Sequence, residues 1–303
     1  MAPDLSEVFG TLITIGDELL LGDIANGNAH YIAARLRAKG FRLKSILTIG
    51  DAESEIVEAL STRVGDARFL IVTGGLGPTE DDRTVQAVSR AFQLPLEPNE
   101  TYRKWLQARL EARQRPWTEG LLRMILLPRG AVKLGFEMAG FALTRGGLPC
   151  YFLPGVPHEM ELLLDELVIP DLERLYPRRL SYRKRIIRVQ GMPESEIESR
   201  LAGVSLAGLP VQIGYLPQVA ENWVTVLVAA DGDEQAEEMV RGAQQKIVTA
   251  LGDVRVSGVD EESLEQVVGG ELRRLGRRLA VAESCTGGLL ARRITSVPGA
   301  SDY

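Results

Sequence analysis

The sequence predicts an α/β protein whose largest domain contains a doubly wound, mostly parallel sheet. Apolar stretches of strand length alternate with helical patterns over residues 9–92, and this alternation implies parallel strands joined by helical crossovers. Several of these strands end in glycine-rich or Pro-Gly loops, where such sheets place their ligands. The 303 residues, 45% of them hydrophobic, exceed one ordinary core, so we expect two or three domains.

The first domain is expected to span residues 1–175 and to contain this sheet. Strands are predicted where β-branched and aromatic residues cluster, at residues 9–16, 41–49, 68–73 and 150–153, with shorter ones near 124–127 and 141–144. Helices are predicted where apolar residues recur at helical spacing, at residues 28–39, 53–64, 81–92, 100–114 and 158–175.

The second domain, residues 176–257, is expected to be a small α+β unit. Its predicted elements are a strand at 184–190, a helix at 194–201, strands at 211–215 and 223–230, a helix at 234–251 and a strand at 254–256. This order, β-α-β-β-α-β, is typical of ferredoxin-like and KH-like folds.

Residues 258–303 are predicted to begin a third α/β domain. The expected elements are a helix at 263–275, a strand at 278–282, a loop at 283–288 and a helix at 289–294. A single strand with flanking helices does not bury a core of its own. We therefore expect the apolar residues Leu289, Leu290 and Ile294 to lie at the surface.

Composition argues against several classes of protein. A net charge of −6 disfavours nucleic acid or an anionic membrane as partner, and no apolar run reaches the roughly 20 residues of a membrane span. The N-terminus lacks a signal-peptide pattern, and the distant Cys150 and Cys285 indicate no disulfide framework, so we expect a cytoplasmic protein. With only two histidines, a metal site must rely on oxygen ligands, which suits Mg²⁺ or Mn²⁺.

A basic run between Arg178 and Arg188 raises the alternative of RNA binding. A KH module clamps the RNA backbone with a G-x-x-G loop, and no such loop occurs between residues 178 and 256. We therefore interpret the run as a solvated strand edge and expect no nucleic-acid partner.

The most informative motif is the segment from Thr73 to Asp82. It contains the glycines Gly74, Gly75 and Gly77, then Thr79 and the acids Glu80, Asp81 and Asp82. Glycines let backbone N–H groups approach an anion, and a helix start adds its positive dipole end. Acids beside an anion repel it unless a divalent cation bridges the two. The segment therefore predicts a metal-assisted phosphate site; the alternative is a tight turn whose acids only complement the helix dipole.

Two more loops are expected at the same edge of the sheet. One runs from Gly16 through Glu18 to Asn28, and the other contains Pro154 and Gly155. Because the carboxyl ends of parallel strands meet at one edge, we expect these residues to line a common substrate site with the glycine loop. Two alternatives stay open, namely that Glu18 is a solvated loop acid and that Asn28 caps the next helix.

Ser284 is a further candidate. It follows a predicted strand and precedes Thr286, two glycines and a helix, which is a geometry that exposes a nucleophile beside backbone N–H donors. No base is recognisable nearby, and the alternative is a capped helix start.

Taken together, these motifs resemble the competence/damage-inducible protein CinA family over nearly the whole chain. The segments that carry the resemblance are GDELLLG (16–22), NGNAHYIA (26–33), TGGLGPTEDDRT (73–84), FLPGVPHEM (152–160) and VAESCTGGLLARRITSVPGASDY (281–303). The resemblance implies a first domain of molybdopterin-binding type, a KH-like second domain and a third domain that deamidates nicotinamide mononucleotide.

The resemblance also implies an activity and its residues. The first domain would hydrolyse the diphosphate of ADP-ribose with a divalent metal such as Mg²⁺, Mn²⁺ or Co²⁺. Gly74, Gly75, Gly77 and Thr79 would cradle the diphosphate, and Asp81 and Asp82 would hold the metal. The family suggests a cytoplasmic homodimer that acts on a small nucleotide.

Two departures from the family pattern bear on function. Ser284 matches the deamidase nucleophile, but the tyrosine and lysine of that site belong to a segment beyond Tyr303, so we expect no deamidase activity from residues 1–303. Residues 129–141 differ from an N-P-x-G-T-A-P-G-F type loop of relatives. Two alternatives therefore remain: a deamidase if the natural chain is longer, or a non-catalytic module that binds a pterin or nucleotide.

Overall fold

The computed structural model describes residues 7–62, 67–177, 179–204, 211–218, 221–252 and 255–303. The chain divides into two compact units, Met1–Leu180 and Ser181–Tyr303, here called the first and second unit. Residues 63–64, Arg178 and Val254, which belong to predicted elements or to the basic run, lie outside the described residues. No helix of the described chain is both long and apolar enough to cross a membrane.

The first unit is built on a six-stranded sheet. Its strand order is β2-β1-β3-β8-β7-β6. The strands are β1 (Val8–Ile15), β2 (Phe41–Ile49), β3 (Phe69–Thr73), β6 (Val132–Lys133), β7 (Phe141–Arg145) and β8 (Leu148–Leu153). The first four strands are parallel, and β7 and β6 form an antiparallel edge. The predicted α/β class and the mostly parallel sheet are confirmed.

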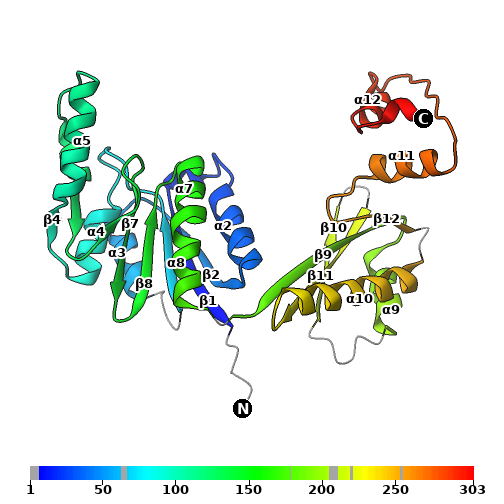
Figure 1. The fold of residues 1–303 in the computed structure, drawn as a ribbon, viewed down its shortest axis with the longest axis horizontal. Helices are drawn as coiled ribbons and strands as arrows, with labels where there is room; N and C mark the ends of the chain where they lie inside the picture. Colours follow the sequence, from blue (N-terminus) through cyan, green and yellow to red (C-terminus); the bar gives the residue numbers. More distant parts are fainter. Residues whose placement is uncertain (1–6, 63–66, 178, 205–210, 219–220, 253–254) are drawn as a thin grey trace, which may run out of the picture. The chain divides into compact units, whose positions relative to one another are not determined.

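Helices cover both faces of this sheet (Figure 1). The helices α2 (Gly27–Ala38), α7 (Pro157–Leu163) and α8 (Ile169–Leu175) pack on one face, and α3 (Glu53–Thr62) and α4 (Thr84–Phe92) pack on the other. Successive residues of a strand face opposite sides. Leu12 of β1 therefore belongs to one core and Ile13 to the other, and both are fully buried. Because helices pack on both faces, the sheet is doubly wound.

A small subdomain extends the first unit between residues 96 and 128. The strands β4 (Leu96–Pro98) and β5 (Leu126–Pro128) pair antiparallel, and the helices α5 (Glu100–Ala112) and α6 (Glu119–Met124) accompany them. A separate core holds the subdomain together; its buried members are Tyr102, Leu106, Leu110 and Ile125. The sequence analysis did not anticipate α6 or the short helix α1 (Asp17–Leu21).

Two predicted helices of the first unit differ from the structure. The helix expected at 81–92 begins only at Thr84, because the Asp82 carboxylate accepts hydrogen bonds from Thr79 and holds residues 79–82 in a turn. The helix expected at 158–175 is interrupted by a π-helical turn, Leu164–Val168, in which the Ile169 N–H donates to the Leu164 carbonyl. This wider turn lies just before Pro170, whose ring cannot fit a regular α-helix interior.

The second unit has the predicted β-α-β-β-α-β order. Its elements are β9 (Ser181–Gln190), α9 (Glu194–Ala202), β10 (Val211–Pro217), β11 (Glu221–Ala230), α10 (Asp233–Leu251) and β12 (Val256–Val259). The four strands pair antiparallel in the order β10-β11-β9-β12. Buried residues of β9, β11, α9 and α10 form one core.

The basic run does not form a sheet edge, so that expectation was wrong. Strand β9 lies between β11 and β12 in the interior of the sheet. Its arginines are compensated by acids: Arg183 pairs with Asp233 at 3.0 Å, and Arg185 pairs with Glu237. Arg188 lies over the ring of Trp223. Ion pairing, not solvation at an edge, therefore accommodates this charge.

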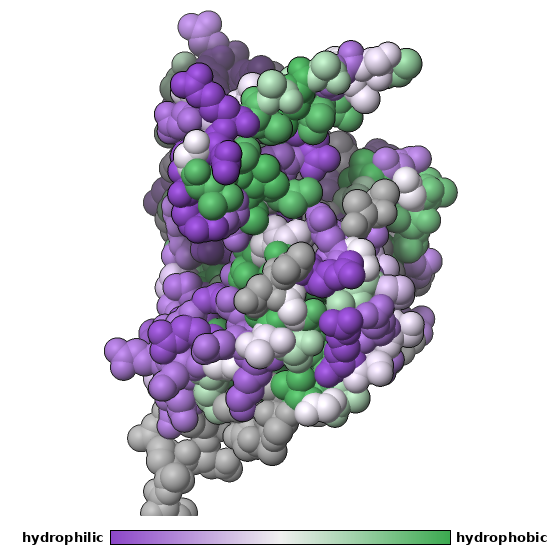
Figure 2. All heavy atoms as spheres, turned by 90° about the vertical axis from the view of Figure 1, so that its right-hand side faces the viewer, coloured by the Kyte–Doolittle hydropathy of each residue, from purple (hydrophilic) through white to green (hydrophobic). Residues whose placement is uncertain are grey.

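The last forty residues contain α11 (Leu264–Arg274) and α12 (Leu289–Thr295). The strand expected at 278–282 is absent from the described chain, because a strand needs a pairing partner and only one backbone bond, from Leu279 N to Tyr303 O, is made there. Apolar side chains show at the surface of this segment in the upper part of Figure 2. Leu289 and Leu290 are 55% and 48% exposed, as expected, whereas Ile294 is half-buried.

Candidate functional site

Backbone hydrogen bonds join the loops that follow β3 and β8. The Gly74 N–H donates to the Leu153 carbonyl at 3.1 Å, and the Thr73 hydroxyl donates to the Pro154 carbonyl at 2.7 Å. The two strands are parallel neighbours in the sheet, so their carboxyl ends emerge side by side. The structure therefore brings the predicted glycine loop and the predicted Pro-Gly loop together.

The loop after β1 joins them through Asn28. The Asn28 Nδ2 group donates to the Gly155 carbonyl at 2.8 Å and to the Thr73 hydroxyl at 3.4 Å. Its neighbour Asn26, not Asn28, caps α2, because Asn26 Oδ1 accepts from the Ala29 N–H at 3.1 Å. Asn28 is therefore free of the capping role and crosslinks two of the three loops.

These loops enclose a cleft of about 460 Å³, here called the glycine-loop cleft. Gly16, Glu18, Gly74, Gly75, Gly77, Asp81, Asp82, Pro154 and Gly155, all predicted site residues, line it. A cleft of this volume is large enough for a nucleotide. Among the described residues, no lysine or arginine lines it, and its carboxylates are Glu18, Asp51, Asp81, Asp82, Glu137 and Glu159.

The glycines of the loop are required by the packing of the chain itself. Gly74 has a φ of 110°, and a Cβ there would lie 2.2 Å from the Ile15 carbonyl oxygen. Gly75 has a φ of 65°, and its Cβ would lie 2.4 Å from the Thr84 hydroxyl. Only glycine tolerates this combination of positive φ and close approach. The tight-turn explanation therefore accounts for why these positions are glycine.

The tight turn leaves backbone donors free at the cleft. The N–H groups of Gly75, Leu76 and Gly77 donate to no acceptor among the described residues. Successive free N–H groups in a loop form a concave site that can bind an anion. The loop thus combines a structural requirement for glycine with the capacity to hold phosphate oxygens.

Thr79 and Asp82 form a closed hydrogen-bonded turn beside this loop. Asp82 Oδ2 accepts from the Thr79 N–H at 2.9 Å and from the Thr79 hydroxyl at 2.6 Å. The two donors of Thr79 are therefore occupied by Asp82 in the structure. Asp82 keeps its second carboxylate oxygen, and Asp81 beside it is exposed.

Asp51 adds a negative charge at the far wall of the cleft. It exchanges hydrogen bonds with Asp17: the Asp17 N–H donates to Asp51 at 2.9 Å, and the Asp51 N–H donates to Asp17 at 3.1 Å. Burial raises the pKa of Asp51, and the nearby charges of Asp17, Glu18 and Asp81 raise this pKa further. The cleft thus concentrates negative charge that an anionic substrate would meet.

The carboxylates do not form a metal cage by themselves. Within the part of the chain that the structure describes, no three side chains of His, Cys, Asp or Glu are placed to hold one metal ion. Mg²⁺ commonly takes one or two protein carboxylates and completes its shell with water and substrate phosphate. Asp81 and Asp82, which both line the cleft, are carboxylates of the type that such a metal takes.

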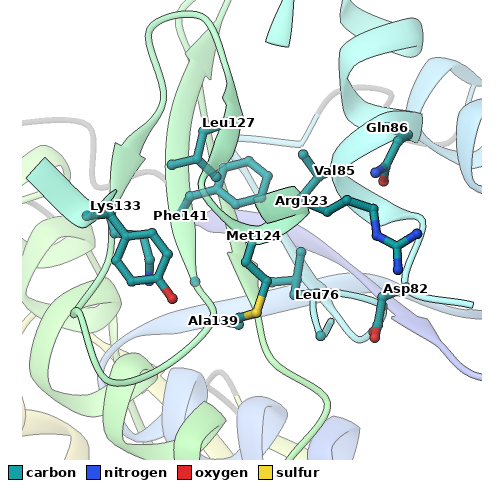
Figure 3. Close-up of a pocket in the computed structure, with 14 residues that line it drawn as sticks. Leu76, Asp82, Val85, Gln86, Arg123, Met124, Leu127, Lys133, Ala139 and Phe141 are labelled. Atoms are coloured by element: carbon teal, nitrogen blue, oxygen red, sulfur yellow. The ribbon is translucent and has the colours of Figure 1, made fainter. Parts of the chain in front are cut away.

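Arg123 of α6 is a candidate that sequence reasoning missed. Its Nη2 donates to the Pro78 carbonyl of the glycine loop at 3.1 Å, and Figure 3 shows its guanidinium directed toward Asp82 and Gln86. It lines a cavity of about 30 Å³ behind the loop, which is room for one or two waters. Arg123 lies next to a stretch interpreted as a strand, and no local motif marked it.

Lys133 holds residues 134–140, which belong to the segment that departs from the family pattern. Its ammonium donates to the carbonyls of Gly135, at 2.7 Å, and of Leu134 and Met138, and it lies over the Tyr102 ring. Burial lowers the pKa of Lys133 to about 8. Residues 134–140 carry Glu137 and Ala139 to the cleft, so Lys133 positions part of the wall.

Replacing Lys133 with Met should loosen this segment. Without the ammonium, three carbonyls lose their hydrogen-bond donor. This loss should lower the local stability of the segment by about 1 kcal/mol or more. We expect amide exchange of residues 134–140 to accelerate about tenfold. Lys104→Met, at an exposed position of α5, is the control and should leave that exchange unchanged. Equal protection in the two variants would show that Lys133 does not hold the segment.

Ser284 is exposed in the loop before α12. The neighbouring Glu283 carboxylate accepts from the N–H groups of Leu290, at 3.0 Å, and Ala291, at 2.8 Å. Glu283 therefore occupies two of the donors at the start of this helix. Among the described residues, the Ser284 hydroxyl forms a hydrogen bond with Cys285 Sγ at 3.7 Å.

Comparisons with protein families cover most of the chain. Residues 11–174 match the family described as "Probable molybdopterin binding domain". Residues 184–255 match the damage-inducible protein CinA KH domain, and residues 261–303 match the CinA C-terminal domain.

Individual relatives agree with these matches. A CinA-like protein of Syntrophobacter fumaroxidans is 53% identical over 297 residues, covering 98% of this chain and 70% of the relative. A CinA-like protein of Desulfotalea psychrophila is 38% identical over 295 residues, covering 96% and 71%. A solved structure of the protein CinA from Thermoplasma acidophilum is 28% identical and covers 54% of this chain and 96% of that one, with a TM-score of 0.48. The chain belongs to the CinA family.

Proposed function

We propose that the first unit hydrolyses the diphosphate of ADP-ribose or a similar nucleotide with the help of a divalent cation. The observation that carries this proposal is that Gly75, Leu76 and Gly77, whose N–H groups have no acceptor among the described residues, line a nucleotide-sized cleft together with carboxylates. A diphosphate would bind to the N–H groups through its oxygens. Water would add across the P–O–P bridge and release AMP and ribose 5-phosphate.

The excess of carboxylates is what favours a metal in this proposal. A diphosphate is negatively charged. The six carboxylates that line the cleft, with no lysine or arginine among the described lining residues, would therefore repel it. Asp81 and Asp82 would hold Mg²⁺, Mn²⁺ or Co²⁺ at the mouth of the loop. When bound, the metal supplies charge neutralisation, polarises a phosphoryl oxygen and activates water. The hydrogen bonds from Thr79 keep the Asp82 carboxylate in place for this role.

The test is ADP-ribose hydrolysis by the purified chain. AMP release is measured with Mg²⁺, Mn²⁺ or Co²⁺, and the same reaction with EDTA is the control. Metal-dependent AMP release is the expected result. If no metal supports AMP release while ADP-ribose still binds, the proposal is wrong and the first unit is a binding module.

Arg123 should contribute to binding the charge of the diphosphate if its side chain turns from the small cavity behind the glycine loop toward the cleft. Its guanidinium makes no ion pair among the described residues, so its remaining N–H groups can then donate to phosphate. We expect Arg123→Gln to lower kcat/KM about tenfold to a hundredfold, the usual worth of a charge-assisted hydrogen bond. Lys104→Gln removes the same charge from the exposed face of α5 and should leave kcat/KM unchanged. Equal rates in the two variants would remove Arg123 from the site.

A further inference from the structure

A second cavity opens beside the glycine-loop cleft. It has a volume of about 300 Å³ and lies between the loop after β1, the start of α2 and the loop after β8. Ile15, Glu18 and Gly155 line both spaces, so a ligand in one is adjacent to the other. We call it the side cavity. Its volume is at the lower end of the range of ligand sites.

The side cavity differs from the cleft in its chemistry. Its surface is mainly apolar, with contributions from Leu19, Ile24 and Pro157, and no lysine or arginine among the described residues lines it. A charged phosphate would therefore find the imidazole of His30 as its one potential cationic partner there. The groups that can still interact are mostly hydrogen-bond acceptors, among them the carboxylates of Glu18 and Glu161.

Asn28 supplies the most informative of these acceptors. Its Nδ2 is occupied by the Gly155 carbonyl, which also establishes which end of the amide is the oxygen. Its Oδ1 is buried and has no hydrogen-bond partner in the structure. A buried acceptor without a donor costs about 1–3 kcal/mol. A ligand in the side cavity would reach this oxygen only after the amide rotates away from the Gly155 carbonyl, and a donor on that ligand would then offset this cost.

Two other polar side chains of the wall are already satisfied. Asn26 caps α2 and donates to the Thr14 hydroxyl, and the Tyr31 hydroxyl donates to Asp165 at 2.9 Å. The cavity therefore best fits an uncharged, partly apolar group that carries hydrogen-bond donors. The hydroxyls of a ribose ring have this character, and carboxylates are common partners of ribose hydroxyls.

We propose that the side cavity binds an uncharged ribose half of the nucleotide, with Asn28 Oδ1, Glu18 and Glu161 accepting its hydroxyl protons. This inference rests on the proposed function, because the proposed function places the diphosphate at the glycine loop, in the adjacent cleft. The shared entrance at Glu18 and Gly155 lets one molecule occupy both spaces. The site then selects substrates that carry a sugar next to the diphosphate. Inorganic pyrophosphate has no sugar and would not use the side cavity.

The test measures binding to the full chain by calorimetry with Mg²⁺ present, because the proposed function needs a divalent cation for a diphosphate to bind beside the carboxylates. The ligands are a methylene-bridged ADP-ribose that cannot be hydrolysed, adenosine, ribose 5-phosphate and inorganic pyrophosphate. Ala25→Trp places a large ring at an exposed position of the cavity wall, and Asn28→Ala removes the unpartnered oxygen. Gln107→Ala, on the exposed face of α5, is the control. Thermal unfolding of each variant confirms that it is folded.

We expect Ala25→Trp to weaken ADP-ribose binding about tenfold or more, while pyrophosphate changes less than twofold. Asn28→Ala also removes the Nδ2 crosslink to Gly155, so it should weaken ADP-ribose binding by a larger factor than pyrophosphate binding. Whichever of adenosine and ribose 5-phosphate loses affinity in parallel identifies the sugar. Equal weakening of pyrophosphate, no weakening of any ligand, or no binding of either fragment to the unaltered chain would overturn the inference. Because the measurement needs no turnover, an inactive but sugar-binding chain would refute the hydrolase proposal alone.

Discussion

Replacing Asp81 with Asn is expected to reduce metal-dependent turnover of ADP-ribose by about 10²–10³-fold, the usual loss when one charge-stabilising group is removed. Asp81 is exposed at the cleft, and the Thr79 hydroxyl, which lowers the pKa of the Asp81 carboxyl by hydrogen bonding, can still donate to an asparagine amide oxygen, so the fold should be unaffected. Asp82→Asn should lose as much activity, and its amide oxygen can still accept from the Thr79 N–H. The double variant should be inactive while folded.

The control for these variants is Glu80→Gln. Glu80 is adjacent in sequence and exposed, but it does not line the cleft, so the same change of charge should leave turnover within twofold. Raising the metal concentration should partly restore Asp81→Asn if the defect is metal affinity. Undiminished turnover in the double variant would exclude both acids from the mechanism.

Gly74→Ala should be the most destabilising single substitution at the site. The new Cβ would lie 2.2 Å from the Ile15 carbonyl oxygen, and the residue would keep a φ of 110°. The strained backbone and the collision together should cost about 3 kcal/mol or more, because β1 and β3 are fully buried neighbours that cannot separate locally. Calorimetry should show a lower midpoint for the unfolding of the first unit.

Gly130→Ala separates the two causes. Gly130 also has a positive φ, 83°, but a Cβ there would meet nothing within 4 Å. It should therefore cost only the backbone strain, about 1–2 kcal/mol. If Gly74→Ala were no more harmful than Gly130→Ala, the close approach of the glycine loop to β1 would not matter to stability.

Local patterns were sufficient to predict most elements of the chain. The strands of the parallel sheet are apolar runs that lie between two layers of helices, and such runs are visible without the fold. The prediction failed where a distant or side-chain partner decided the outcome. Asp82 holds Thr79 and delays α4, and residues 278–282 have no strand to pair with. Neither effect appears in local periodicity.

The sequence by itself determined the fold class, the β-α-β-β-α-β order of the second unit and the three loops at one edge of the first sheet, because each depends on residue type and spacing along the chain. Tertiary structure alone decided which groups at that edge are free. Hydrogen bonds to Asp82 occupy Thr79, and bonds to Thr14 and Thr48 occupy the Asn26 amide, whereas the N–H groups of Gly75 to Gly77 and the Asn28 oxygen have no partner among the described residues. It also brought Arg123 to the glycine loop, because contacts between residues far apart in sequence exist only once the chain has folded.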